Sequence, residues 1–143
     1  MGESMGEAGE NYLETIWMLK EKKQIVRAVD LARELGYSKA SISYGLGNLK
    51  KEGYVVVKAH GSLELTEKGA AIAQRVYDRH RTLTAFFALC AGVPEEEAER
   101  DACRVEHILS EVIYQGIKRT LARWRLAEKD SPVQRTVLDG QAE

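Results

Sequence analysis

Apolar side chains recur at helical spacing in the first third of the chain and predict three consecutive elements. The first stripe begins near residue 10 and ends in a charged turn at residues 20–24, and its members are Tyr12, Leu13, Ile16, Trp17 and Leu19. A short helix follows as far as Leu35, after which Gly36 suits the left-handed residue that ends many helices. Ser38 is a good N-cap for a third helix. Two short helices joined by a tight glycine-containing turn predict a helix-turn-helix.

The spacing of apolar residues changes after this third helix. Residues 54–58 form a largely β-branched run, residues 59–62 include a glycine, and residues 63–66 alternate between apolar and polar side chains. Two such runs on either side of a glycine-bearing turn indicate a β-hairpin. A hairpin that directly follows a helix-turn-helix is typical of a winged helix.

Helical spacing returns after the hairpin and continues towards the end of the chain. Thr66 is a candidate N-cap for a helix that runs to about Cys90. Residues 91–94 break the pattern, and Pro94 with the acids at residues 95–97 favours the start of another helix. Its expected apolar stripe consists of Ala98, Ala102, Val105, Ile108, Leu109, Val112 and Ile113.

These elements predict a mainly α fold in two parts. Residues 1–72 are expected to form a winged helix-turn-helix DNA-binding domain, and residues 73–143 an all-helical domain. Residues 1–9 are small and polar, so we expect them to fray. The residues from about position 129 onwards are expected to be weakly ordered, because polarity rises there and a proline interrupts the pattern.

Composition restricts the class of protein. A length of 143 residues allows one ordinary domain or two small ones, and 44% apolar with 30% charged residues is ordinary for a soluble globular protein. The sequence contains neither an apolar run of about 20 residues, as a membrane span requires, nor the pattern of a signal peptide. We therefore expect a cytoplasmic protein without a membrane partner. Two cysteines are too few for a disulfide framework and are expected to be thiols.

The net charge of −1 gives no general attraction to nucleic acid, so a DNA-binding surface must be a local patch. Basic residues outnumber acidic ones between residues 22 and 58, which is such a patch. In a helix-turn-helix, small or hydrogen-bonding residues at the start of the second helix reach bases and phosphates. The candidate DNA-binding residues are Arg27, Ser38, Lys39, Ala40, Ser41, Ser43, Tyr44, Lys50, Lys58 and His60. The alternative is a solvated helix face whose serines act only as caps.

A second group of residues indicates metal chemistry. Cys103, Glu106 and His107 fall at positions i, i+3 and i+4, which share one face of a helix. Sulfur, carboxylate and imidazole together are costly to bury without partners, but they suit a divalent transition metal. The alternative is that Cys103 is a small buried hydrophobe while Glu106 and His107 are solvated.

Four segments together resemble the diphtheria toxin repressor family, which contains iron-dependent repressors and manganese transport regulators. They are residues 10–16, the predicted helix-turn-helix, the hairpin with the residues 65–69 that end it, and residues 101–110. The resemblance covers roughly residues 10–119. It implies a homodimeric transcriptional repressor, without enzymatic activity, that binds double-stranded operator DNA and controls metal homeostasis genes. It also implies Fe(II) or Mn(II) as cofactor, held at the joint between the DNA-binding domain and a helical metal-binding and dimerisation domain.

Carried over position by position, the resemblance implies the metal ligands Asn11, Glu14, His80, Glu99, Cys103, Glu106 and His107. Cys103 matches the iron branch, whereas Glu14 matches the manganese branch. Asn11 departs from both, because iron members carry Met there and manganese members carry Asp. Thr84 is a poor ligand at the secondary site of the iron branch, although Glu99 could still contribute beside His80. Two alternatives remain open: Asn11 as a helix N-cap, and His80 as a solvated surface residue.

Iron members also carry a C-terminal SH3-like domain, for which this chain is too short, so we expect a compact two-domain protein. A rival function is a winged-helix regulator that senses an oxidant through Cys103 without a metal. A metalloenzyme built on His80, Glu106 and His107 is disfavoured, because the sequence shows neither a positioned base nor a substrate cleft.

Overall fold

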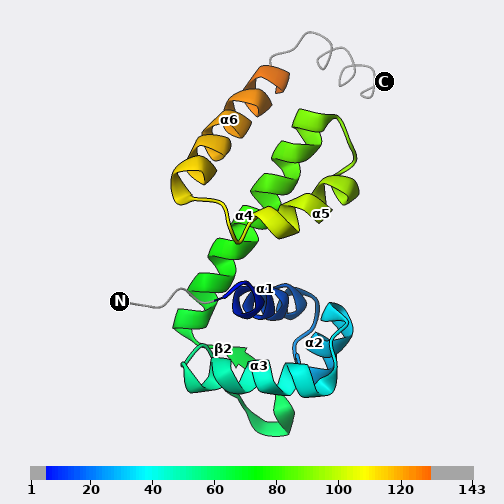
Figure 1. Cartoon of the computed structure of the whole chain (residues 1–143), viewed down its shortest axis with the longest axis vertical. Coiled ribbons are helices and arrows are strands. Elements are labelled where there is room, and N and C mark those ends of the chain that lie inside the picture. Colours follow the sequence, from blue (N-terminus) through cyan, green and yellow to red (C-terminus); the bar gives the residue numbers. More distant parts are fainter. Residues whose placement is uncertain (1–5, 130–143) are drawn as a thin grey trace. The chain divides into compact units, whose positions relative to one another are not determined.

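The computed structural model describes residues 6–129, and the expected disorder of residues 1–5 and 130–143 lies outside the described residues. The elements in chain order are α1 (Glu7–Lys22), α2 (Ala28–Leu35), α3 (Lys39–Lys51), β1 (Val55–Val57), the 3₁₀ turn η1 (Ala59–Gly61), β2 (Leu63–Leu65), α4 (Glu67–Ala91), α5 (Glu95–Val105) and α6 (Glu111–Lys129). Figure 1 labels the six helices and β2. A winged helix-turn-helix is followed by helices only, which confirms the predicted fold class.

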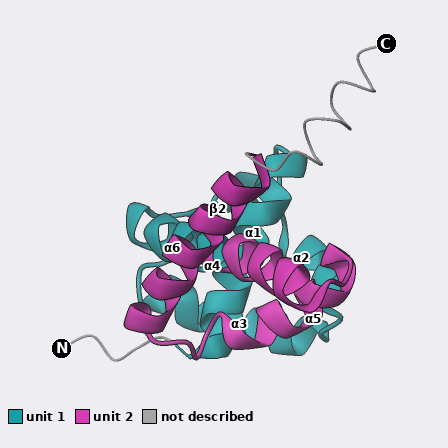
Figure 2. Ribbon diagram, turned by 90° about the horizontal axis from the view of Figure 1, so that it is seen from above, with its two compact units in different colours: residues 1–78 teal, residues 79–143 magenta. Residues whose placement is uncertain are grey.

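The chain divides into two compact units, which Figure 2 shows in teal and magenta. The N-terminal unit is Met1–Asp78 and the C-terminal unit is Arg79–Glu143, so the division falls inside α4. The boundary expected from the sequence, between residues 72 and 73, stays a prediction.

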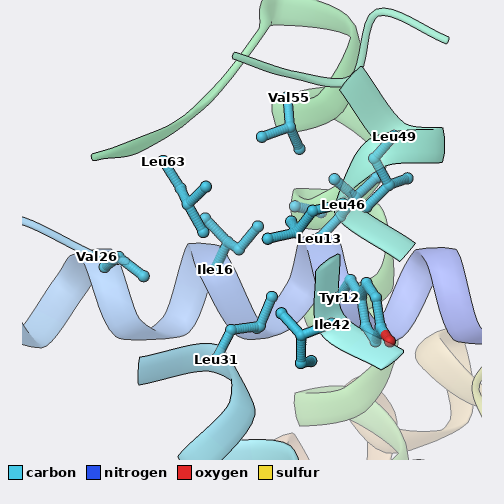
Figure 3. Packing of buried hydrophobic residues seen from close by; sticks show 11 residues of the cluster. Tyr12, Leu13, Ile16, Val26, Leu31, Ile42, Leu46, Leu49, Val55 and Leu63 are labelled. Atoms are coloured by element: carbon cyan, nitrogen blue, oxygen red, sulfur yellow. The ribbon is translucent and has the colours of Figure 1, made fainter. Parts of the chain in front are cut away.

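The core of the N-terminal unit lies between α1, α2, α3 and the hairpin. In Figure 3, Leu13 and Ile16 of α1 point towards apolar side chains of α3 and of the two strands. The buried cluster consists of Tyr12, Leu13, Ile16, Val26, Leu31, Ile42, Leu46, Leu49, Val55, Leu63 and Ala73. Burial of this apolar surface is the main force that holds α3, the second helix of the helix-turn-helix, against α1.

Local capping signals fix the end of α2 and the starts of α3 and α4. Gly36 has a φ of 69° and closes α2 in the left-handed conformation. The Ser38 hydroxyl accepts a hydrogen bond from the Ser41 amide at 3.1 Å, and Thr66 Oγ1 accepts one from the Gly69 amide at 3.0 Å. All three predicted caps are confirmed.

The hairpin is antiparallel, with Val55 opposite Leu65 and Val57 opposite Leu63. The Leu63 amide donates to the carbonyl of Val26 at 2.8 Å, which attaches β2 to the segment before α2. Arg27 Nε donates to the carbonyl of His60 at 2.8 Å, which connects the start of α2 to the tip of the wing. The wing is therefore held to the segment around the start of α2 at two points, the first residue of β2 and the tip.

Two boundaries differ from the sequence analysis. α1 begins at Glu7, so residues 7–9 are helical rather than frayed. The stripe expected to run from Ala98 to Ile113 is interrupted, because α5 ends at Val105 and α6 begins at Glu111. Ile108 and Val112, which would continue the stripe, are 76% and 80% exposed.

Asp30 stabilises the start of α2 and provides a test of this local structure. Its carboxylate pairs with Lys23 Nζ at 2.7 Å and accepts the Arg27 amide at 2.9 Å. The hydrogen bond from Lys23, followed by that from the Arg27 amide, lowers the pKa of Asp30. We expect Asp30→Ala to reduce the free energy of unfolding by about 1 kcal/mol at pH 7 in urea titrations followed by circular dichroism.

The direction in which the stability loss of Asp30→Ala changes with pH follows from the lowered pKa. A carboxylate with a lowered pKa in the folded protein stabilises it above the ordinary pKa of about 3.9 and loses that effect as the pH falls further. The difference between wild type and Asp30→Ala should therefore persist at pH 5 and shrink below about pH 4. Glu34→Ala, an exposed acid on the same helix, is the control. Equal stability of the Asp30 variant and wild type at pH 7 would contradict the assignment.

Candidate metal centre

His80 lies in the second half of α4 and is buried in the C-terminal unit, with 7% of its surface exposed. Its Nδ1 is 2.9 Å from Glu106 Oε2, and its Nε2 is 3.0 Å from Glu99 Oε1. Both ring nitrogens therefore have a carboxylate partner. The alternative of a solvated surface histidine is wrong.

Cys103 projects from α5 towards the same imidazole. Its Sγ lies 3.5 Å from His80 Nδ1. The ligand atoms that His80, Glu99 and Cys103 offer all lie within 4.8 Å of one another. The residue is exposed, so the alternative of Cys103 as a small buried hydrophobe is also wrong.

Glu106 lies between two imidazoles. Its second carboxylate oxygen, Oε1, is 3.2 Å from His107 Nε2, and the side chains of Glu106 and His107 are only 1% and 3% exposed. The idea that these two residues are solvated is therefore wrong. The three residues predicted to share one helical face do converge, together with His80 and Glu99.

This convergence survives the early end of α5. The Glu106 amide still donates to the carbonyl of Ala102 at 3.0 Å, and Glu106 keeps right-handed helical dihedral angles. The amides of Ile108 and Leu109 both return to the carbonyl of Val105, which closes a turn. The i, i+3 and i+4 spacing therefore places Cys103, Glu106 and His107 along the last turn of the helix and the residues just beyond it.

The charges around His80 explain how it is held. The hydrogen bond with Cys103, followed by that with Glu106, raises the pKa of His80 to about 11 in spite of its burial. The His80 imidazole is therefore protonated at neutral pH and supplies a positive charge beside Glu99, Cys103 and Glu106. Imidazole, thiolate and carboxylate are together a donor set that fits a divalent transition metal.

The remaining candidate ligands lie on α1, in the N-terminal unit. Glu14 is buried, and Asn11 is partly buried. Asn11 does not cap α1, because Gly6 occupies the N-cap position, so that alternative is wrong. The Thr84 hydroxyl donates a hydrogen bond to the carbonyl of His80 at 2.7 Å, so its hydrogen is used within the backbone of α4. The assignment of Asn11 and Glu14 as ligands stays a prediction.

All ten candidate DNA-binding residues are exposed in the N-terminal unit. Ser38, the N-cap of α3, and the candidates from Lys39 to Tyr44 lie around its first turns, where Tyr44 is 76% exposed. Lys50 lies in its last turn. Ser38 does act as a cap, and its hydroxyl also donates to Ser41 Oγ at 3.0 Å. Their contact with DNA stays a prediction.

Sequence reasoning missed Arg79, the neighbour of His80. Its guanidinium donates to the carbonyls of Glu106 and Leu109 and to the carboxylate of Glu111. The local sequence has two arginines around His80, and nothing in their spacing distinguishes this one from a solvated cation. What identifies Arg79 is its contact with a distant part of the chain, and this contact is visible only in the folded structure.

No helix in residues 6–129 has the length and apolar character needed to cross a membrane.

Comparison with known proteins identifies both halves of the chain. Residues 4–63 match the family model of the iron dependent repressor N-terminal DNA binding domain, and residues 66–132 match that of the iron dependent repressor metal binding and dimerisation domain. Among curated relatives, the HTH-type transcriptional regulator MntR of Geobacillus kaustophilus is 39% identical over 71% of this chain and 71% of its own length. The iron-dependent repressor IdeR of Mycobacterium tuberculosis is 33% identical over 78% of this chain.

A solved manganese-dependent transcriptional repressor in complex with manganese superimposes with a TM-score of 0.74 at 29% sequence identity, over 80% of this chain and 52% of that structure. The chain spans about half the length of this repressor and of IdeR, of which it covers 49%. The matched domains, their order and the identity to MntR agree with one another. The chain therefore belongs to the iron-dependent repressor family.

Proposed function

We propose that this chain is a metal-dependent, DNA-binding transcriptional repressor that responds to Fe(II) or Mn(II) and controls metal homeostasis genes. In this proposal it acts in the cytoplasm as a homodimer on double-stranded operator DNA and has no enzymatic activity. The observation that carries the proposal is the cluster of acidic, thiol and imidazole groups around His80, in a chain whose other unit is a winged helix.

The C-terminal unit would contribute most of the metal ligands. They are His80, Glu99, Cys103, Glu106 and His107, with Asn11 and Glu14 of α1 proposed as additional ligands. A bound divalent cation would supply the positive charge that this donor set requires, and binding would release protons from the ligands. Glu106 orients both imidazoles, since its two oxygens contact different rings.

The N-terminal unit would read DNA through α3. Its first turn can place the side chains of Ser38 and Lys39 near phosphates, together with the amides of the helix N-terminus. Ala40 and Tyr44 are exposed one turn apart and would face base edges in the major groove. Two copies in a dimer would then read half-sites about one DNA turn, or a multiple of it, apart.

Contacts inside the N-terminal unit provide a route from α1 to the recognition helix. Tyr12 follows Asn11 directly, and its hydroxyl donates to the carbonyl of Ser41 on α3 at 3.4 Å. A change in the order or position of α1 would therefore act on α3 through a direct packing contact. The cation can shift the protein towards its DNA-competent state only by as much as it binds that state more tightly.

Titration of operator DNA tests the proposal. The operator is first selected from random duplex DNA in the presence of Mn(II), and binding is then measured anaerobically with Mn(II), with Fe(II) and with a chelator. We expect tight binding only when metal is present. Equal operator affinity in the chelator and with metal would refute metal control. Failure to select any duplex would refute sequence-specific DNA binding.

Cys103 allows a test of metal preference. Thiolates favour softer cations, whereas carboxylates suit Mn(II), so Cys103→Glu should shift the ratio of Fe(II) to Mn(II) affinity towards manganese. The measurement is anaerobic metal titration of wild type and variant with operator binding as the readout. Cys90→Ser, an exposed thiol on α4, is the control. An unchanged ratio would show that Cys103 does not set the preference.

The oxidant sensor is not favoured, because the relatives are iron- and manganese-dependent regulators. Cys103→Ser separates the two functions. An oxidant sensor would lose its response to peroxide while it kept metal-independent DNA binding, whereas the proposed repressor would lose metal affinity.

A further inference from the structure

We propose that Arg79 is a positioning residue that holds the turn between α5 and α6 in the shape that presents Glu106 and His107 to the metal. This inference rests on the proposed metal-dependent function. It concerns a side chain that is not itself a ligand, and it explains why the turn after α5 is ordered where the helix ends.

The Arg79 guanidinium donates hydrogen bonds to three acceptors on this turn. Nη1 donates to the carbonyl of Glu106 at 3.1 Å and to that of Leu109 at 2.7 Å, while Nη2 donates to Glu111 at 2.6 Å. These acceptors span the whole connection from the end of α5 to the first residue of α6. The Arg79 side chain is only 11% exposed, so its two hydrogen bonds to carbonyls are partly shielded from water, whereas the Glu111 carboxylate is 61% exposed.

Tyr114 of α6 contacts the guanidinium through its ring. Arg79 Cζ lies 4.9 Å from the ring centroid, and Tyr114 is buried. The Tyr114 hydroxyl donates to Thr82 Oγ1 on α4 at 3.3 Å, which keeps the ring in place. Arg79 is thus held between the turn and an aromatic ring, and its planar group has little freedom to move.

The end of a helix creates the need for such a donor. Carbonyls at and just beyond the end of a helix have no partner within it. Here they include the carbonyl of Glu106, the C-cap residue of α5, and that of Leu109 in the turn that follows. Arg79 supplies donors to this region from α4, where it directly precedes His80 in the sequence. The same turn of α4 therefore carries a candidate ligand and fixes the segment that carries two others.

An arginine is needed for this role because of its shape. A guanidinium offers donors in a rigid fork, so it can reach two carbonyls and a carboxylate at once. A lysine keeps the charge and most of the length, but it offers its three donors from a single atom. Arg79→Lys should therefore keep the unit folded while it loosens the turn.

The test compares Arg79→Lys and Arg79→Met with wild type, and Arg75→Met serves as the control. Arg75 lies one turn earlier on α4, and its exposed guanidinium makes a single ion pair with Glu10 at 3.0 Å. Anaerobic Co(II) titration gives the affinity and the absorption spectrum of the bound ion. Hydrogen exchange of the amides in residues 106–111 is measured on the metal-free proteins.

We expect both Arg79 variants to bind Co(II) about 10–100-fold more weakly than wild type, as for other residues that orient metal ligands. Their residues 106–111 should exchange faster without metal, and the Co(II) spectrum should change. Arg75→Met should match wild type. If Arg79→Met does not fold, Arg79→Lys decides the outcome.

Wild-type affinity and spectrum in Arg79→Lys would overturn the inference and leave the proposed function intact. Unfolding of Arg79→Lys would also overturn it, because a residue on which the whole unit depends is not a local positioning residue. Absence of Co(II), Fe(II) and Mn(II) binding in wild type would instead refute the proposed function itself.

Discussion

Glu106→Gln is expected to weaken Mn(II) binding by more than the roughly 10–100-fold that loss of a residue behind a ligand costs. The substitution keeps the size of the side chain but removes its charge. Glu106 is buried and contacts both His80 and His107, so its carboxylate is the central anionic group of the cluster. Operator binding at limiting Mn(II) should fall with the metal affinity, which a titration of the selected operator measures.

Glu97→Gln is the matched control, because Glu97 is an exposed acid on α5. It loses the same charge and should leave both affinities unchanged. The metal-free variants should also be compared by circular dichroism, so that loss of binding is separated from loss of folding. A folded Glu106→Gln protein with wild-type Mn(II) affinity would remove Glu106 from the ligand set.

The sequence predicts those parts of the fold that short segments determine. Ser38, Thr66 and Gly36 occupy their expected cap positions because capping depends on residues within one turn. The wing is found for the same reason, since two strands and the turn between them are adjacent in the chain. Helical spacing likewise predicts that Cys103, Glu106 and His107 share one face, whereas the part of His80 in the site came only from the family resemblance.

Contacts between distant segments explain what the sequence does not reveal. Ile108 and Val112 continue the apolar spacing of α5, so the pattern alone extends a helix that the structure ends at Val105. The carbonyl of Glu106, the residue that follows this end, accepts a hydrogen bond from Arg79, which lies 27 positions earlier in the chain. The spacing of residues along the sequence cannot predict a hydrogen bond between two such distant positions. Burial of His80 has the same origin, because it depends on packing against α5.

Substitution of Gly45 or Gly47 on α3 by alanine is expected to have the second large effect. The change in the free energy of unfolding should have opposite signs at the two positions. A Cβ on Gly45 would lie 2.0 Å from Tyr12 Cε2, whereas a Cβ on Gly47 would meet no described atom within 4 Å apart from its chain neighbours and the backbone of its own helix. Gly45→Ala must therefore displace a buried ring and its hydrogen bond to Ser41. We expect it to lower the free energy of unfolding by about 1–3 kcal/mol.

Gly47→Ala should instead stabilise the protein by about 0.5–1 kcal/mol, because alanine restricts the unfolded chain and favours the helix. Thermal unfolding of both metal-free variants measures the two effects. If Tyr12 transmits the state of α1 to the recognition helix, Gly45→Ala should also weaken operator binding at saturating Mn(II), where the protein is folded. Equal operator affinity of folded Gly45→Ala and wild type would show that the close contact serves packing alone.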